Sequence, residues 1–317
     1  MYKFCTLFDS NYLTRGLTNY ESLKKHCKCF HLYIFAFDSK CYSVLTKLKL
    51  EFVTIISLKE FEDEELLRIK AGRTVGEYCW TCTPSIIKYC IEYYDLDSCT
   101  YIDADLYFFR DPTVLIDEMG SNSVLITEHR YSVKYNQVAS SGIYCVQFMT
   151  FKNNKEGMET LNWWRDSCIE WCYARFEDGK FGDQKYLDDW TTRFNGIHVL
   201  EHLGGGVAPW NIQQYDLSKD GGFKLIFYHF HDFKYTYNGK VDMGAYKLRK
   251  TDIDILYTPY ANHMEKVAQK LNQIEPLNTF DGSPAHQRFS FKTILKYFYR
   301  KINGTYNVVD KKDLLKA

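Results

Sequence analysis

Short apolar runs alternate with amphipathic stretches along the first half of the chain. Each run is rich in β-branched and aromatic residues and is bounded by turn-forming residues, which is typical of buried strands. The predicted strands span residues 2–9, 30–37, 52–56, 99–109 and 123–129. The predicted helices span residues 16–28, 41–50 and 84–94, the last with Thr83 as N-cap and Pro84 at its first position. This alternation predicts an α/β fold in which helices cover both faces of a mostly parallel sheet.

The second half of the chain is less regular. Residues 142–151 and 225–231 have the composition of strands, and residues 156–175 that of a helix. No internal repeat is present, and no composition shift marks a linker before about residue 260. We therefore predict a single Rossmann-like α/β domain at 1–260 and a helical C-terminal extension at 261–317.

An amphipathic basic stretch lies near the C-terminus, at residues 289–303. Its apolar residues recur at helical spacing and are Phe291, Ile294, Leu295, Phe298 and Ile302. Its positive charges are Lys292, Lys296, Arg300 and Lys301. A helix of this type can lie in the interface of a membrane. It can equally dock on its own domain, with the lysine stems covering apolar surface, and the sequence leaves both interpretations open.

Composition narrows the class of protein. The 40 basic and 40 acidic residues give a net charge of zero, which argues against a nucleic-acid partner. No apolar run is long enough to span a membrane, and Asp9, Asn11 and Arg15 interrupt any signal-peptide core. We therefore expect a cytoplasmic protein, peripheral to the inner face of a membrane if the basic stretch binds lipid. An odd count of 11 cysteines, with no second pair to match Cys79 and Cys82, favours reduced thiols over a disulfide framework or a zinc site.

The strongest chemical signal follows the predicted strand at 99–109, in Asp103-Ala-Asp105. Ligands of parallel sheets bind at the carboxyl ends of the strands. At positions i and i+2 the two carboxylates project to one side, where their oxygens can hold a divalent cation such as Mg²⁺ or Mn²⁺. A solvated pair that ends a strand gives the same pattern, so the motif alone does not decide.

A second polar group ends another apolar run. His229 and His231 share a face of the predicted strand at 225–231, and Lys234 follows in the expected turn. One imidazole can complete a metal's coordination, and the lysine can neutralise a diphosphate as a point charge. Two histidines with a lysine, in a chain that also carries Asp103 and Asp105, favour a metal site over ordinary core histidines.

The ordered set of motifs resembles nucleotide-diphospho-sugar glycosyltransferases of the A-type (GT-A) fold, and is most similar to the retaining family-eight group and its bacterial polysaccharide-assembly relatives. The motifs that carry this resemblance are Thr6-Leu-Phe8-Asp9-Ser-Asn-Tyr12, Asp103-Ala-Asp105, Asp183-Gln184 and His229 with Lys234. The resemblance covers about residues 1–260. It implies a single GT-A domain, a Mn²⁺ or Mg²⁺ cofactor, a nucleotide-sugar donor and a glycan or lipid-linked acceptor.

The resemblance also implies roles for single residues. For the nucleotide, uracil and ribose would contact Thr6, Phe8, Asp9 and Tyr12. For the metal, the ligands would be Asp103 (which also touches ribose), Asp105 and His229, with His231 as the alternate. Lys234 would hold a phosphate, and Asp183 and Gln184 would lie beside the anomeric carbon. The acceptor would lie near His129, Trp210 and Asn211, because residues 202–211 resemble the segment that such enzymes place there.

Two departures leave the sugar and the stereochemistry open. The family-eight group has Gly-x-x-Lys-Pro-Trp after its metal histidine, whereas this chain has Asp232-Phe-Lys234-Tyr. The group also has a donor-binding arginine at the start of the helix before its D-x-D motif. This chain offers Ser85 or Lys88 there, with Arg73 further upstream.

Three other classes fit the sequence less well. A haloacid-dehalogenase phosphatase needs its D-x-D on the first strand, but Asp103 arrives after 100 residues. A sugar-nucleotide pyrophosphorylase needs a glycine-rich first turn, which FDSNYLTRG does not provide. A non-catalytic sugar- or nucleotide-binding module would keep the fold without needing the metal carboxylates. The sequence therefore favours a metal-dependent glycosyltransferase, with UDP-sugar as donor and a lipopolysaccharide or capsule precursor as acceptor; the non-catalytic module is the alternative.

Overall fold

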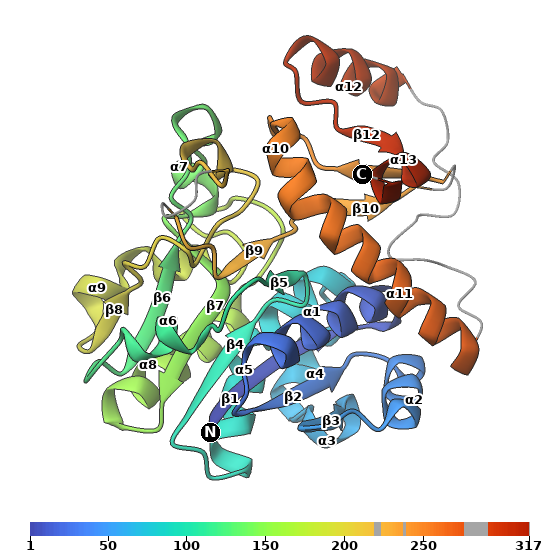
Figure 1. Ribbon diagram of the computed structural model, residues 1–317. Helices are drawn as coiled ribbons and strands as arrows, with labels where there is room; N and C mark the ends of the chain where they lie inside the picture. Colours follow the sequence, from blue (N-terminus) through green and yellow to red (C-terminus); the bar gives the residue numbers. More distant parts are fainter. Residues whose placement is uncertain (219–222, 237–238, 276–290, 317) are drawn as a thin grey trace.

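A seven-stranded mixed sheet forms the centre of the molecule in the computed structural model, which describes residues 1–218, 223–236, 239–275 and 291–316 (Figure 1). The strand order is β3-β2-β1-β4-β7-β6-β8. These strands are β1 (Tyr2–Phe8), β2 (Phe30–Ala36), β3 (Val53–Ser57), β4 (Ser98–Ile102), β6 (Val124–Glu128), β7 (Tyr144–Lys152) and β8 (Ile197–Val199). Within this sheet, β7 is the described strand that runs antiparallel to its neighbours, β4 and β6. The predicted α/β fold with a mostly parallel sheet is confirmed.

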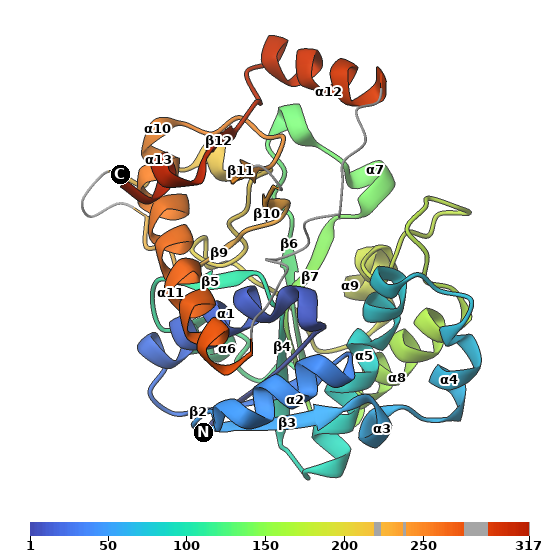
Figure 2. The ribbon, with the colours of Figure 1, turned by 90° about the vertical axis from the view of Figure 1, so that its right-hand side faces the viewer.

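Helices cover both faces of this sheet (Figure 2). One face carries α1 (Leu13–His26), α2 (Ser39–Leu48), α6 (Thr113–Asp117) and α11 (Thr258–Ile274). The other carries α3 (Leu58–Phe61), α4 (Glu64–Lys70), α5 (Val75–Tyr93), α8 (Lys155–Glu170) and α9 (Trp190–Arg193). Side chains of β1 alternate between the two cores: Phe4 and Phe8 face α1, whereas Cys5 and Leu7 face α5. Burial on both faces explains why the strands are continuous apolar runs.

Helix α5 begins earlier than the sequence predicts. We expected Thr83 to cap a helix that starts at Pro84, but the helix begins at Val75 and contains Pro84 in its interior. The cap is Thr74, whose side chain accepts from the backbone N–H of Glu77 while the Glu77 carboxylate accepts from the Thr74 N–H. An interior proline costs about 3 kcal/mol of helix propensity. Burial of one face of the first turns of α5 against the sheet and α8 offsets that cost.

The predicted strand at 99–109 is two strands. It ends at Ile102 in β4 and resumes as β5 (Leu106–Phe108), which leaves the main sheet and pairs antiparallel with β9 (Phe227–His229). Between them the chain turns, and the N–H of Leu106 donates to the carbonyl oxygen of Asp103 at 3.2 Å. The D-x-D motif therefore occupies a tight turn at the carboxyl end of β4 rather than an extended strand.

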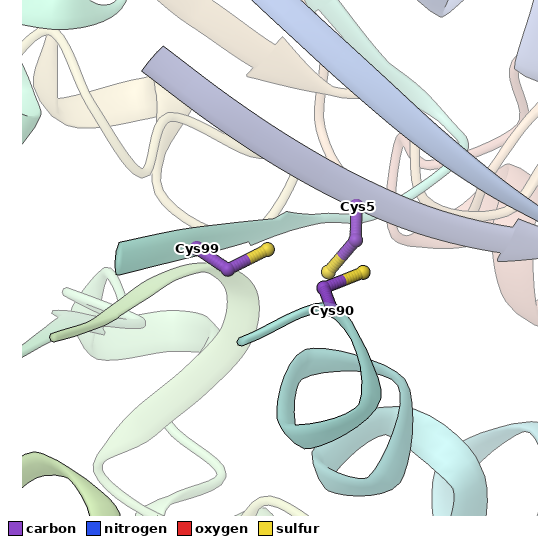
Figure 3. Close-up of side chains that lie close together, drawn as sticks. All are labelled: Cys5, Cys90 and Cys99. Carbon is purple, nitrogen blue, oxygen red and sulfur yellow. The ribbon is translucent and has the colours of Figure 1, made fainter. Parts of the chain in front are cut away.

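Most of the cysteines lie in the core. All 11 are free thiols, and nine of them are buried. The sulfur atoms of Cys5, Cys90 and Cys99 lie within 4.8 Å of one another between β1, α5 and β4 (Figure 3). Burial raises the pKa of Cys5 and Cys90 well above the ordinary value. Burial also acts to raise the pKa of Cys99, but its hydrogen bonds with Cys5 and Cys90 outweigh that effect and lower this pKa to about 5.

The C-terminal part adds a three-stranded antiparallel sheet beside the main domain. Its strands are β10 (Phe233–Tyr235), β11 (Lys240–Met243) and β12 (Val308–Asp310), and its helices are α10 (Lys250–Asp252), α12 (Phe291–Ile302) and α13 (Lys311–Lys316). The predicted helix at 289–303 corresponds to α12, although residues 289–290 lie outside the described residues. Of the helices that the structure describes, none has the length and apolarity to cross a membrane. The division of the chain at residue 260 stays a prediction.

Candidate active site

A pocket of about 600 Å³ opens at the carboxyl ends of β1 and β4, the edge at which the sequence places a ligand site. It collects residues from distant parts of the chain. Of the residues expected at a site, the pocket is lined by Phe8, Asp9, Tyr12, Asp103, Asp105, His129, Asp183, Gln184, Trp210, His229 and His231. The predicted candidates are therefore largely neighbours in space.

The pairing of β5 with β9 brings His229 to the D-x-D turn. Leu106 lies opposite His229 in this ladder, and the N–H of Phe230 donates to the carbonyl oxygen of Asp105 at 3.0 Å. As a result, Nε2 of His229 lies 3.1 Å from Oδ1 of Asp105 and 3.7 Å from Oδ2 of Asp103. One ligand atom from each of the three residues falls within 4.8 Å of the others. His231 lines the pocket but does not belong to this group.

Two further side chains fix the orientation of the group. The ring nitrogen Nδ1 of His229 donates to Oε1 of Gln147 at 2.9 Å, which directs Nε2 toward the carboxylates. The main-chain carbonyl of the same Gln147 accepts from the N–H of Asp103 at 3.0 Å. The hydroxyl of Tyr101 donates to Oδ1 of Asp103 at 2.8 Å. Gln147 on β7 thus contacts both the D-x-D turn and the histidine.

The charges of the three residues are strongly linked. Burial raises the pKa of Asp103 to about 6, helped by the neighbouring charge of Asp105 and opposed by His229. Burial also acts to raise the pKa of Asp105, but the charge and hydrogen bond of His229 outweigh it and lower that pKa to about 2. Against the effect of burial, Asp105 raises the pKa of His229 well above its usual value. In the absence of metal the site therefore holds an imidazolium between carboxylates, and a divalent cation would replace its Nε2 proton.

Asp183 is a buried residue that lines the pocket, near Asp103. It is 5% exposed, and burial first, then the charge of Asp103, raises its pKa to about 8. Its main-chain carbonyl accepts from the indole N–H of Trp164 at 2.8 Å. The neighbouring Gln184 donates through Nε2 to the carbonyl oxygen of Ser141 at 2.7 Å. A protonated Asp183 can donate a hydrogen bond at neutral pH.

An aromatic wall closes the pocket on the side of the histidines. The ring of Trp210 lies 5.5 Å from the rings of both His229 and His231, and its indole N–H donates to the carbonyl oxygen of His129 at 2.8 Å. The imidazole of His129 stacks on Tyr131 at 4.5 Å. Such flat faces with polar edges suit contacts with sugar rings.

Three predicted site residues are not among the residues that line the pocket. Thr6 and Asn211 are buried, and Asn211 donates to the carbonyl oxygens of His129 and Gly206 at 2.8 Å. Lys234 was expected in a turn but lies in β10, opposite Asp242 of β11. The turn falls earlier, at Asp232, which has φ +63°.

One wall of the pocket could not be expected from a helix that starts at Pro84, because α5 begins at Val75. Residues of α5 that line this wall include Gly76, Cys79, Trp80 and Thr83, which are spaced i, i+3, i+4 and i+7; Val75, the first residue of the helix, also lines it. That spacing is the signature of one helix face and was visible in the sequence. Tyr131 and Tyr246 also line the pocket, but they lie outside any motif, so no local signal marked them.

Comparison with known proteins agrees with this architecture. The chain superposes on the galactosyltransferase LgtC in complex with donor and acceptor sugar analogues with a TM-score of 0.56 and 12% identity, over 83% of this chain and 95% of that one. It superposes on the glycosyltransferase GlyE of Streptococcus pneumoniae with a TM-score of 0.51 and 14% identity, over 86% of this chain and 62% of that one. The fold is therefore that of the A-type glycosyltransferases.

At the level of sequence, no family model matches the chain. It is 31% identical to the uncharacterized protein YfnD of Bacillus subtilis over 287 residues, which is 87% of this chain and 92% of that protein. The chain belongs to the same family as YfnD.

Proposed function

We propose that the protein is a metal-dependent glycosyltransferase that moves a sugar from a nucleotide diphosphate, with UDP as the nucleotide, to a glycan or lipid-linked acceptor. The observation that carries this proposal is the group of Asp103, Asp105 and His229 in one pocket at the carboxyl edge of the sheet. A non-catalytic binding module has no need to hold two half-buried carboxylates beside a buried histidine, because that arrangement is costly without a cation.

The residues of this group fit Mn²⁺ or Mg²⁺. Two carboxylates and one imidazole are ligands that these cations accept, and Gln147 orients the imidazole with Nε2 toward the carboxylates. A bound cation would supply positive charge next to the diphosphate of the donor. We assign Asp103, Asp105 and His229 to hold it, and the position of His231 outside the group leaves that residue to line the pocket.

The donor nucleotide is assigned to the end of the pocket near β1. Phe8, Asp9 and Tyr12 line that end and follow the resemblance to UDP-binding enzymes. Thr6 is buried beneath them and would support the strand rather than touch the base. We assign Lys234, which follows His231 by three residues and lies in β10, to neutralise a phosphate, as the resemblance implies.

The reacting centre is assigned to Asp183 and Gln184. In the transfer, the bond from the sugar's anomeric carbon to the diphosphate oxygen breaks, and the electron pair leaves with the diphosphate. The acceptor hydroxyl oxygen bonds to the anomeric carbon, and its proton passes to the oxygen of the departing diphosphate. Because the pKa of Asp183 is raised to about 8, this residue would donate a hydrogen bond to a sugar hydroxyl at neutral pH.

The acceptor is assigned to the aromatic wall of Trp210, His129 and Tyr131, with Asn211 supporting His129 from behind. A glycan, or a lipid-linked precursor of lipopolysaccharide or capsule, would present sugar rings to this wall. The exposed apolar side chains of α12, together with Lys296 and Lys301, suit contact with an anionic membrane surface from the cytoplasmic side.

Titration calorimetry of UDP tests the donor site. Wild-type protein should bind UDP with Mn²⁺ and lose that binding in EDTA, and Asp105→Ala should abolish the metal-dependent part. Asp166→Ala, at an exposed position on α8, is the matched control and should bind as wild type. With a UDP-sugar substrate, Asp105→Ala should lower turnover on the order of 10²–10³-fold. If UDP, GDP and CMP all fail to bind, both with Mn²⁺ and in EDTA, the result would favour the non-catalytic module.

A further inference from the structure

Helix α12 contacts β11 and the loop that follows it through the side chain of Arg300. Among the described side chains from 294 to 302, only that of Arg300 is buried, at 6% exposed. Its guanidinium makes a bidentate pair with Asp242 of β11, at 2.7 and 2.8 Å, and also donates to the carbonyl oxygen of Gly244 at 2.6 Å. A buried, bidentate arginine of this kind fixes geometry as well as charge.

A second residue of the same segment contacts the same loop. Asn307 precedes β12 and is 9% exposed. Its side-chain Nδ2 donates to the carbonyl oxygens of Gly244 at 3.0 Å and Tyr246 at 2.6 Å, and its main-chain carbonyl accepts from the N–H of Met243 at 3.0 Å. Both amide protons of Asn307 are therefore used on the chain that runs from Gly244 to Tyr246.

That loop forms part of the pocket. Tyr246 lines it, and the tyrosine ring packs edge-on against Tyr135 at 5.0 Å and against Trp210 at 6.4 Å. Gly244 has φ +87°, so the backbone turns sharply at the point where Arg300 and Asn307 hold it. The N–H of Lys247 donates to the hydroxyl of Tyr135 at 2.8 Å, so Tyr135 contacts both the ring of Tyr246 and the backbone that follows it.

We infer that Arg300 and Asn307 are positioning residues that hold Tyr246 in the wall of the sugar-binding pocket, so that the C-terminal extension completes that pocket. The effect of this positioning on catalysis rests on the proposed function. The positioning of Tyr246 by Arg300 and Asn307 is independent of it. In Figure 1, α12 and β12 lie together beyond β10, as seen from the main sheet. A helix with this much exposed surface is marginal alone in water, so its link to the loop also sets its own position.

The test replaces Asn307 by an isostere that cannot donate. Asn307→Asp keeps the shape of the side chain and turns its two donor hydrogens into an acceptor oxygen. Asn303→Asp is the matched control, because it makes the same chemical change just beyond the end of α12. The side chain of Asn303 donates to the carbonyl oxygen of Tyr299, within the same helix segment and away from residues 244–247. Three quantities are measured on the full chain: hydrogen exchange of residues 244–247, UDP affinity with Mn²⁺, and hydrolysis of a UDP-sugar.

In Asn307→Asp we expect exchange in residues 244–247 to accelerate at least about tenfold and hydrolysis to fall by a similar factor, with the UDP dissociation constant within about twofold of wild type. Asn303→Asp should leave all three unchanged. The inference would be overturned if residues 244–247 of Asn307→Asp exchanged at the wild-type rate. It would also be overturned if exchange accelerated while hydrolysis stayed unchanged, or if UDP binding and hydrolysis were lost to the same extent. If Asn307→Asp does not fold, Arg300→Lys replaces it with the same criteria. Failure of wild-type protein to bind UDP would defeat the proposed function, while the exchange measurement would still decide the positioning.

Discussion

The imidazole of His229 is held by Gln147, with Nδ1 and Oε1 2.9 Å apart. The two residues lie on β9 and β7, strands of different sheets, and Gln147 is fully buried. The amide oxygen can only accept, so it fixes the proton on Nδ1 and leaves Nε2 for the cation. The proposed metal site therefore depends on a residue that would not itself be a ligand.

Replacing Gln147 should weaken the metal site without removing a ligand. We expect Gln147→Leu to raise the dissociation constant for Mn²⁺ about 10–100-fold, because His229 loses the partner that sets its orientation. Electron paramagnetic resonance of free Mn²⁺ measures this in the absence of any substrate. Gln147→Glu retains an acceptor oxygen and should lose less. Gln273→Leu, at an exposed position on α11, is the control. Equal Mn²⁺ affinity in wild type and Gln147→Leu would contradict the role.

Asp183 should cost the protein stability at neutral pH. Burial raises the pKa of Asp183 from 3.8 to about 8. Between these two pH values the folded protein binds more protons than the unfolded chain. The free energy of unfolding of the wild type therefore falls as the pH rises through this range. In EDTA, Asp183→Asn should therefore be more stable than wild type at pH 8, by about 1 kcal/mol or more, and the gain should shrink toward pH 4. Urea unfolding at the two pH values measures it. A gain of the same size at both would refute the assignment.

The pairing of α1 with α11 should be lost in acid. Glu21 accepts from His263 at 2.7 Å and from Lys270 at 2.9 Å, and these contacts lower its pKa from 4.5 to about 2. The stabilisation is present above pH 4.5 and is lost as the pH falls toward 2. Because the carboxylate is partly exposed, we expect Glu21→Gln to cost about 1 kcal/mol at neutral pH and nothing near pH 2. Urea unfolding provides the comparison, with Glu159→Gln at an exposed position of α8 as control. A pH-independent cost would show that the ion pair is not responsible.

Membrane contact through α12 can be tested without removing the segment. Deleting 289–317 is a poor test, because it would also remove β12 from its sheet and Leu314 from the core. Substituting Leu295 and Phe298, which are 54% and 56% exposed, by Glu keeps the fold and should abolish sedimentation with anionic phospholipid vesicles. The same double substitution at Leu67 and Val75 on α4 and α5, also exposed, should not. Vesicle binding that survives the α12 substitutions would rule out this surface.

The pattern of apolar residues was sufficient to predict those elements whose buried side chains recur with the regular spacing of a strand or a helix. The first three strands and the helices between them follow directly from apolar periodicity, because both faces of the sheet are covered and the strands must be apolar throughout. The order of the motifs also gave the A-type fold and most residues that line the pocket. Asp103 and Asp105 end an apolar run, so their place at the edge of the sheet could be expected from the sequence alone.

Local pattern failed where distant contacts outweighed it. Pro84 is a strong helix-start signal, yet it lies inside α5, because the turns before it bury Tyr78 and Cys82 against the rest of the core. The run from Cys99 to Phe109 is mostly apolar and aromatic, and Asp103 and Asp105 are its only charged residues. It divides there because β5 pairs with β9, a partner that lies far along the chain.

The sequence by itself determined the class of fold, the edge of the sheet that carries the site, and the carboxylates and histidines available to it. Those features follow from composition and spacing within single segments, where neighbouring residues set each other's environment. Only the tertiary structure decided that His229 rather than His231 joins the two aspartates, that Gln147 orients it, and that Asn307 reaches the pocket wall. These are hydrogen bonds between strands and loops far apart in the chain, and their geometry is set by strand pairing and packing rather than by local propensity.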